Sequence, residues 1–164
     1  MVIYMVNWKQ ILIREATYSD LEKIKFLWLK LAEEMYKIEE YIYPSRENAE
    51  RWFLSVLSTL RERRGKVFIA QIGGEIVGFI YFTYSLEMFL DVSKRVAFIS
   101  DMYVKPEFRR RGIGSLLLEK CFEHLRKLNM KHVMLSVLSE NLAAVKFYEK
   151  HGFKICRYDM SRNI

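Results

Sequence analysis

Apolar side chains recur every three or four residues in four stretches of the chain, the spacing of one buried face of an α-helix. Ser19 and Asp20 offer N-caps at the start of the first stretch, and Gly152 offers a natural stop after the last. Helices are therefore predicted over residues 20–36, 46–64, 112–128 and 141–150.

The segments between these helices are rich in β-branched and aromatic residues, which favour strands. Strands are predicted over residues 11–14, 66–72, 75–84, 95–104, 133–138 and 153–160. Gly73-Gly74 between two of these runs is a hairpin signal. The run at 95–104 is apolar on both faces, which is typical of a central strand. The resulting order, β α α β β β α β α β, predicts a mixed sheet covered by helices on both faces.

The bulk properties fit one soluble domain spanning residues 1–164, with residues 1–10 as an N-terminal extension. Hydrophobic residues make up 51% of the chain, enough for a sizeable core. Lys and Arg number 27 against 20 Asp and Glu, so the net charge is +7. This surplus suits nucleic acid, an acidic membrane or a polyphosphate cofactor, and is equally compatible with a solvated lysine-rich surface.

Cysteine and histidine usage gives no indication of a metal site. Cys121 and Cys156 have neither metal-ligand nor C-x-x-C spacing, and His124, His132 and His151 are scattered. No 18-residue apolar stretch and no secretory signal are recognisable. We therefore expect a reducing, cytoplasmic location and no membrane partner.

A candidate phosphate-binding loop, Arg109-Arg110-Arg111-Gly112-Ile113-Gly114, joins the central strand to the third helix. A helix N-terminus presents unpaired N–H groups, glycines allow close approach, and arginines bind phosphate oxygens. The dinucleotide fingerprint needs a third glycine where Leu117 stands, and the P-loop pattern is absent. On its own, the motif is equally compatible with a glycine-rich turn carrying exposed arginines.

A second motif follows one strand later and reads Asn141-Leu-Ala-Ala-Val-Lys-Phe-Tyr148-Glu-Lys-His-Gly152-Phe153. Together the two motifs resemble the GNAT superfamily of acyl-CoA N-acyltransferases, with R-x-x-G-x-G opening a helix and N-x-x-A-x-x-F-Y-x-x-x-G-F after it. The opening Ile13-Arg-Glu-Ala-Thr17 with Asp20 is also similar to that family. The resemblance spans about residues 11–158 and implies an α/β (α+β) fold with a mixed, mostly antiparallel sheet of six to seven strands and about four helices.

The resemblance also implies acetyl-CoA as cosubstrate and direct transfer to an amine within a ternary complex. Tyr148 would donate a proton to the CoA thiolate, while the strand backbone would hold the pantetheine arm and the loop N–H groups the pyrophosphate. The implied cofactor-binding residues are Met102, Tyr103, Val104, Arg109, Arg110, Arg111, Gly112, Ile113, Gly114, Ser115, Asn141 and Tyr148.

The general base has a less definite signature. Asp101 precedes Val104 by three residues and could accept the amine proton, or could simply pair with a neighbour such as Arg95. Glu34, Glu39 and Glu40 fall in the region that borders the acceptor site in the family, and could equally be solvated charges on a helix end. A core position is expected for Cys121, which favours direct transfer over a covalent acyl-enzyme.

Two stretches, 76–84 and 100–104, look like the diamine branch of the superfamily. Ser100 stands where that branch usually has Glu, which puts a polyamine in doubt and leaves a small primary amine as the expected acceptor. The run Leu135-Ser-Val-Leu138 lacks the arginine often seen in ribosomal N-terminal acetyltransferases. Many superfamily members dimerise, so a homodimer is expected.

Two other functions remain open from the sequence. One is a non-catalytic CoA-binding protein, and the other is a nucleic-acid-binding module without a recognisable nucleic-acid motif. The basic residues such a module would use are Arg61, Arg63, Arg64, Lys66 and Arg109–Arg111.

Overall fold

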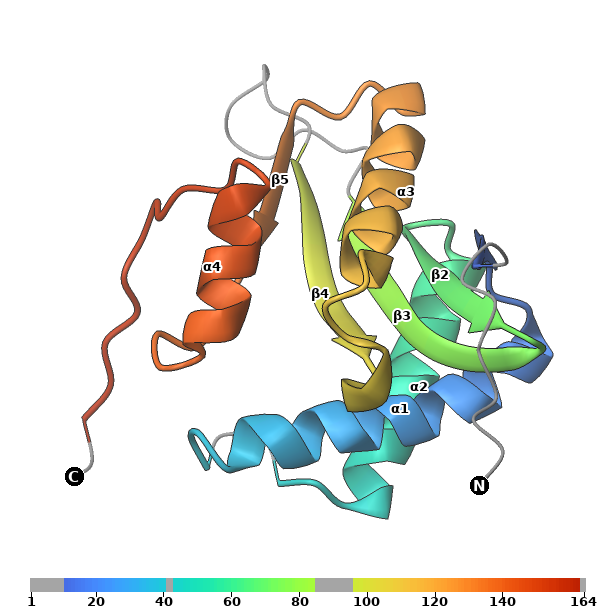
Figure 1. The fold of residues 1–164 in the computed structure, drawn as a ribbon, viewed down its shortest axis with the longest axis horizontal. Helices are drawn as coiled ribbons and strands as arrows, with labels where there is room; N and C mark the ends of the chain where they lie inside the picture. Colours follow the sequence, from blue (N-terminus) through green and yellow to red (C-terminus); the bar gives the residue numbers. More distant parts are fainter. Residues whose placement is uncertain (1–10, 41–42, 85–95, 163–164) are drawn as a thin grey trace.

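The structure is a computed structural model that describes residues 11–40, 43–84 and 96–162. The predicted extension 1–10 and Arg95 lie outside these residues. In chain order the elements are β1 (Leu12–Glu15), α1 (Tyr18–Tyr36), α2 (Arg46–Arg61), β2 (Gly65–Ile72), β3 (Glu75–Tyr84), β4 (Val96–Val104), the 3-10 turn η2 (Pro106–Phe108), α3 (Ile113–Lys127), β5 (His132–Leu135) and α4 (Leu142–Lys150) (Figure 1).

The sheet of the described residues has five strands in the order β1-β2-β3-β4-β5. The first three pairings are antiparallel and the last, between β4 and β5, is parallel. The predicted mixed, mostly antiparallel sheet with four helices is therefore confirmed. The prediction of six to seven strands is wrong for the described part of the chain.

The missing strand is the one predicted over residues 153–160. The described residues after Gly152, 153–162, form no strand, and Tyr158 and Met160 are 81% and 96% exposed. A strand needs a neighbour for its backbone hydrogen bonds. Phe153 still packs against the α3 cluster, but the chain beyond it runs along the outer side of α4 (Figure 1). Its strand-like composition therefore has no pairing partner among the described residues of this chain.

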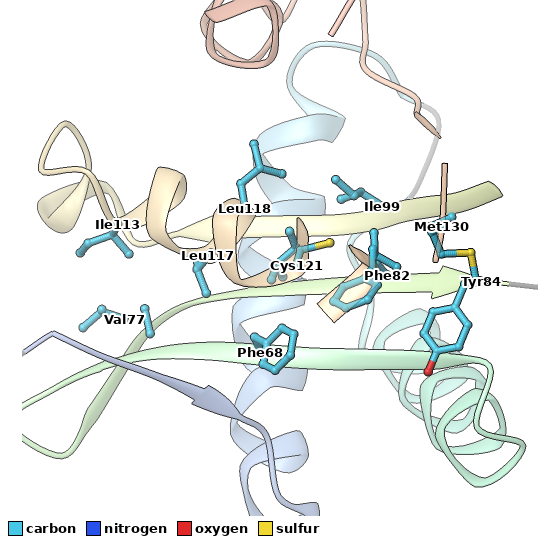
Figure 2. Close-up of a cluster of buried hydrophobic side chains, with 14 of the residues drawn as sticks. Phe68, Val77, Phe82, Tyr84, Ile99, Ile113, Leu117, Leu118, Cys121 and Met130 are labelled. Atoms are coloured by element: carbon cyan, nitrogen blue, oxygen red, sulfur yellow. The ribbon is translucent and has the colours of Figure 1, made fainter. Parts of the chain in front are cut away.

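Two apolar clusters, one on each face of the sheet, form the core. On one face α3 packs with Leu117, Leu118 and Cys121 against Phe82 and other sheet residues (Figure 2). On the other face α1 and α2 cover the sheet, with Leu21, Ile24 and Val56 fully buried. The helical spacing seen in the sequence thus marks the faces that meet the sheet.

An irregularity in β4 decides which side chains reach each face. The register shifts where Tyr81 pairs with Asp101 and Phe82 pairs with Ile99, so that Ser100 is the extra residue of a bulge. Before the bulge, Ile99 belongs to the α3 cluster; after it, Met102 packs against that cluster and Tyr103 belongs to the α1/α2 cluster. Because alternate residues share a face, the bulge puts Asp101 on the α1/α2 side.

The start of α1 is capped by Thr17, not by Ser19 or Asp20 as the sequence indicated. Asp20 lies one turn into the helix, where its Oδ2 accepts the Thr17 N–H at 2.8 Å. Arg14 of β1 donates to both oxygens of the same carboxylate, at 2.6 and 3.0 Å. This side chain therefore fastens β1 to the helix that follows it.

Candidate active site

The pairing between β4 and β5 ends before β4 does. β4 pairs with β5 only from Val96↔His132 to Ile99↔Leu135, although β4 continues to Val104. Residues 100–104 consequently have no strand partner on that side within the described chain. A linear ligand with amide groups can lie along such an exposed backbone edge, as an added strand would.

The predicted phosphate loop follows directly on this edge. Arg110 and Gly112 both have left-handed backbones, with φ of 63° and 81°. Left-handed residues within a turn direct successive N–H groups into a concavity that binds anions, and α3 begins at the next residue. The backbone of the loop 109–114 is thus arranged for a phosphate-like ligand.

The side chain of Arg109 points across to α1. Its Nη2 donates to both carboxylate oxygens of Glu34 at 2.8 Å, and its Nε donates to the Val104 carbonyl at 2.7 Å. The guanidinium carbon also lies 5.3 Å from the ring centroid of Tyr103. Arg109 therefore ties the loop to α1, while Arg110 and Arg111 are exposed.

α4 brings the second motif to the same opening. Asn141 caps the helix by accepting the Ala144 N–H at 3.2 Å. One turn further, Phe147 packs against the start of α3, since a Cβ added to Gly114 would lie 3.3 Å from its ring. Burial and the nearby charge of Asp101 raise the pKa of Tyr148 to about 12, so its hydroxyl is protonated at neutral pH.

A further contact between α3 and α4 involves Ser115 and His151. His151 Nδ1 lies 2.8 Å from the carbonyl of Phe147, and Nε2 lies 2.9 Å from the Ser115 hydroxyl. A carbonyl only accepts, so Nδ1 carries the hydrogen and, in the neutral ring, Nε2 accepts from Ser115. This contact fixes the predicted cofactor residue Ser115 against α4.

Asp101 is held by two residues that the sequence did not single out. Trp28 of α1 donates its indole N–H to Oδ1 at 3.0 Å, and Trp52 of α2 donates to Oδ2 at 2.9 Å. The two indoles stack with centroids 5.5 Å apart. Burial raises the pKa of the Asp101 carboxyl, against the opposing effect of the two N–H bonds. Arg95, the alternative partner, lies outside the described residues.

The structure thus brings Asp101, Tyr148 and the loop 109–114 together at the β4–β5 opening. Glu34 reaches this region through Arg109, whereas Glu39 and Glu40 are exposed beyond the end of α1. Cys121 is buried in the α3 cluster, where burial raises the pKa of its thiol to about 12. No cluster of potential metal ligands occurs among the described residues.

The class of protein follows from comparison with known families: the chain is an acetyltransferase. A profile described as the acetyltransferase (GNAT) family matches residues 25–153, and the chain belongs to that family. The sequence-based identification is therefore confirmed, and acetyl-CoA is the acetyl donor of this fold family. The nucleic-acid-binding and non-catalytic alternatives gain no support.

Three relatives carry the same class name. The chain is 34% identical over 143 residues to an uncharacterized N-acetyltransferase of Archaeoglobus fulgidus, covering 87% of this chain and 92% of the relative. It is 31% identical to an uncharacterized N-acetyltransferase of Methanocaldococcus jannaschii, but spans only 60% of that relative's length. An N-alpha-acetyltransferase of Sulfurisphaera tokodaii is 28% identical, with 89% of this chain and 81% of the relative covered.

A solved structure has the same fold. The tetramutant of the Bacillus halodurans protein BH1408 superimposes with a TM-score of 0.80 at 23% identity, covering 93% of this chain and 99% of that one. Within the described residues, none of the helices is both long and apolar enough to cross a bilayer.

Proposed function

We propose that this chain transfers the acetyl group of acetyl-CoA directly to the primary amine of a small molecule within a ternary complex. The observation that carries the proposal is the proximity of Asp101 from β4 and Tyr148 from α4, beside a turn whose left-handed residues favour anion binding. The negative charge of Asp101 contributes to the raised pKa of Tyr148, although the two residues belong to different elements. A proton acceptor and a proton donor therefore lie near one another where the strands part.

The cofactor is proposed to bind along this opening. The backbone of Met102, Tyr103 and Val104 would pair with the pantetheine amides, since it has no strand neighbour there. The N–H groups from Arg109 to Gly114 would receive the pyrophosphate, as the left-handed turn favours. Ser115 and Asn141, at the starts of α3 and α4, would border the cofactor arm.

The chemistry requires a neutral amine, a stabilised oxyanion and a leaving thiolate. Asp101 would accept the amine proton, and a β4 N–H between Met102 and Val104 would polarise the thioester carbonyl. Tyr148 remains protonated at neutral pH, so it can donate to the developing thiolate. Each role is thus matched by a group at the β4–β5 opening.

The chain is further proposed to act in the cytoplasm as a homodimer. Support for self-association comes from the segment after Gly152, where Ile155, Tyr158 and Met160 are 65%, 81% and 96% exposed. Exposed apolar side chains on an extended segment favour packing against another surface. Light scattering of the full chain and of a chain ending at residue 152 would test this.

Cofactor binding is tested by calorimetric titration of acetyl-CoA into the wild type and into Gly112→Glu. The glutamate would oppose the left-handed backbone and repel the pyrophosphate, so at least a tenfold loss of affinity is expected. Gly74→Glu is the matched control because Gly74 is also left-handed, at φ 87°, but lies in the β2–β3 turn.

The Gly74→Glu variant should bind as the wild type does. If Gly112→Glu bound acetyl-CoA as tightly as the wild type, the loop would not be part of the cofactor site. A folded wild type that neither binds acetyl-CoA nor acetylates any member of an amine panel would overturn the acetyltransferase proposal.

A further inference from the structure

His151 joins the ends of two helices. It is the C-cap of α4, and its backbone N–H turns back to the Tyr148 carbonyl. The Phe147 carbonyl, one of the last four of the helix, is met instead by the side-chain Nδ1 at 2.8 Å. Nε2 lies 2.9 Å from the Ser115 hydroxyl in the first turn of α3. Since Ser115 directly follows the loop proposed to receive the cofactor pyrophosphate, one side chain separates the ring from that loop.

The direction of the hydrogen bonds at this contact depends on the charge of the ring. The Phe147 carbonyl only accepts, so Nδ1 carries a hydrogen in either charge state. In the neutral ring, Nε2 therefore takes the single hydrogen of the Ser115 hydroxyl, which leaves Ser115 with lone pairs alone for a further partner. A phosphate oxygen also has only lone pairs. A protonated ring instead donates from Nε2 to Ser115 and releases the hydroxyl hydrogen for a phosphate.

The ring has charged surroundings on several elements. Charged or titratable side chains that line the same cavity, flank the ring on α4 or surround Ser115 are His132 of β5, Lys154 and Cys156 of the C-terminal segment, Glu149 and Lys150 of α4, Arg109–Arg111 before α3, and Glu119 of α3, which pairs with Arg126. These groups are present with and without the cofactor. The charge that binding adds is the negative charge of the pyrophosphate, which favours a protonated ring, as the carbonyl end of a helix also does.

We propose that His151 takes up a proton when acetyl-CoA binds and thereby directs the Ser115 hydroxyl to the pyrophosphate. Nε2 gains a proton from solvent and donates it in a hydrogen bond to Ser115, and Ser115 donates to a phosphate oxygen. Ser115 contacts the cofactor, whereas His151 acts through Ser115 and is a positioning residue. The inference rests on the proposed cofactor site at the loop 109–114, and adds to it a group from a different helix.

Proton uptake makes the affinity for acetyl-CoA depend on pH. A ligand that favours the protonated form of a group is bound more tightly as the pH falls through the range in which that group titrates. Because histidine changes charge between about pH 5 and 8, binding should tighten about three- to fivefold from pH 8 to pH 6.5. The phosphomonoester of acetyl-CoA also titrates, near pH 6, so the effect of the ring must be isolated with variants.

Calorimetric titration of acetyl-CoA at pH 7.5, in buffers that differ in ionisation enthalpy, measures the protons taken up on binding. The wild type should take up roughly a few tenths of a proton per acetyl-CoA. His151→Gln keeps an N–H donor for Ser115 but does not titrate, so its uptake should be close to zero. His132→Gln is the matched control, because His132 lines the same cavity from β5, and its uptake should equal that of the wild type.

A second measurement follows the His151 ring itself. In nitrogen-15 NMR spectra at pH 7.5, acetyl-CoA should move the His151 ring signals from the neutral toward the protonated positions. Unchanged ring signals in the cofactor complex would overturn the proposal. Equal proton uptake by the wild type and His151→Gln would do the same, as would the absence of uptake by a wild type that binds acetyl-CoA.

Ser115→Ala serves if His151→Gln does not fold. It removes the hydroxyl that the protonated ring directs, so the affinity for acetyl-CoA should fall about five- to tenfold at pH 6.5 and by no more than about twofold at pH 8. The same loss at both pH values would overturn the inference. A folded wild type that does not bind acetyl-CoA at all would count against the cofactor site, and with it against the proposed acetyl transfer.

Discussion

Two aspartates, one within α1 and one on β4 facing that helix, are held in contrasting ways. Asp20 accepts two bonds from the Arg14 guanidinium and two more from Thr17, so its own chain neutralises it. Asp101 accepts two indole N–H groups and has no described cation partner. Arg14 holds the pKa of Asp20 well below its usual range, whereas burial raises that of Asp101.

The difference is the one expected between a structural carboxylate and the proposed proton acceptor. Asp20 is 5% exposed and fully occupied, which suits a joint between β1 and α1. Asp101 is oriented by two neutral donors and has no cation partner among the described residues, which suits the proton-accepting role proposed for it. Variants on each side should therefore alter different properties.

The largest effect is expected on the Asp101 side, for Tyr148→Phe. Removal of the phenol O–H should lower kcat about 10²- to 10³-fold, in the range for loss of a general acid, with little change in thermal stability. Steady-state assays at saturating acetyl-CoA would measure it.

Tyr84→Phe is the matched control for that variant. Tyr84 is also buried with a raised pKa, but it belongs to the α3 cluster. Loss of the Tyr84 hydroxyl should leave kcat within about twofold of the wild-type value. A Tyr148→Phe enzyme of normal kcat would exclude Tyr148 as the proton donor.

On the Asp20 side, Asp20→Asn should lower the free energy of unfolding by about 2 kcal/mol, since charged hydrogen bonds to Arg14 are lost. Activity at a temperature where the variant stays folded should change less than twofold. Urea denaturation would measure the change in the free energy of unfolding. Glu22→Gln on the exposed face of α1 is the control and should have almost no effect.

The pH dependence of stability should also distinguish Asp20 from Asp101. Because the folded-state pKa of Asp20 is depressed, its stabilisation is complete above the unfolded value of about 3.9 and is lost as pH falls through the folded value. The stability difference between wild type and Asp20→Asn should therefore shrink below about pH 4. A difference independent of pH would contradict the ion-pair explanation. Protonation of Asp101 acts in the opposite direction, because its folded pKa is raised.

The smallest effect concerns His124, a titratable group on the α3 face. Its Nε2 has no hydrogen-bond partner among the described residues, and burial with the charge of Lys66 lowers its pKa. A lowered folded pKa means that stability is complete above the unfolded value of about 6.5 and falls at lower pH. His124→Phe should remove this loss, so the stability of the variant relative to the wild type should be greater at pH 5 than at pH 7.5. An equal stability difference between wild type and His124→Phe at the two pH values, measured by denaturation, would refute this explanation.

Much of the fold was predictable because local patterns specify it. Helical spacing located all four helices, and Gly73-Gly74 marked the hairpin between β2 and β3. The strand predicted at 153–160 failed because composition measures a tendency to pair, not the presence of a partner. Asp20 was recognised as part of the start of α1, but the cap itself is Thr17.

For the site, the two motifs led to Tyr148 and the loop, because each lies within one continuous segment. Trp28 and Trp52 could not be found in this way. They lie 73 and 49 residues from Asp101 in the sequence, and their indole N–H groups meet it only after α1 and α2 pack on the sheet. Aromatic residues on amphipathic helices give the same signal whether or not their polar atoms are used.

The bulge at Ser100 implies that the site depends on the register of β4 as much as on its residues. If the same residues formed a regular ladder through Ser100, Asp101 and Tyr103 would turn toward α3, and Met102 and Val104 would face α1 and α2. Deletion of Ser100 would instead keep Asp101 on the α1/α2 side, because Ile99 and Asp101 would then follow regular alternation. The bulge thus absorbs one residue without moving a site side chain to the other face.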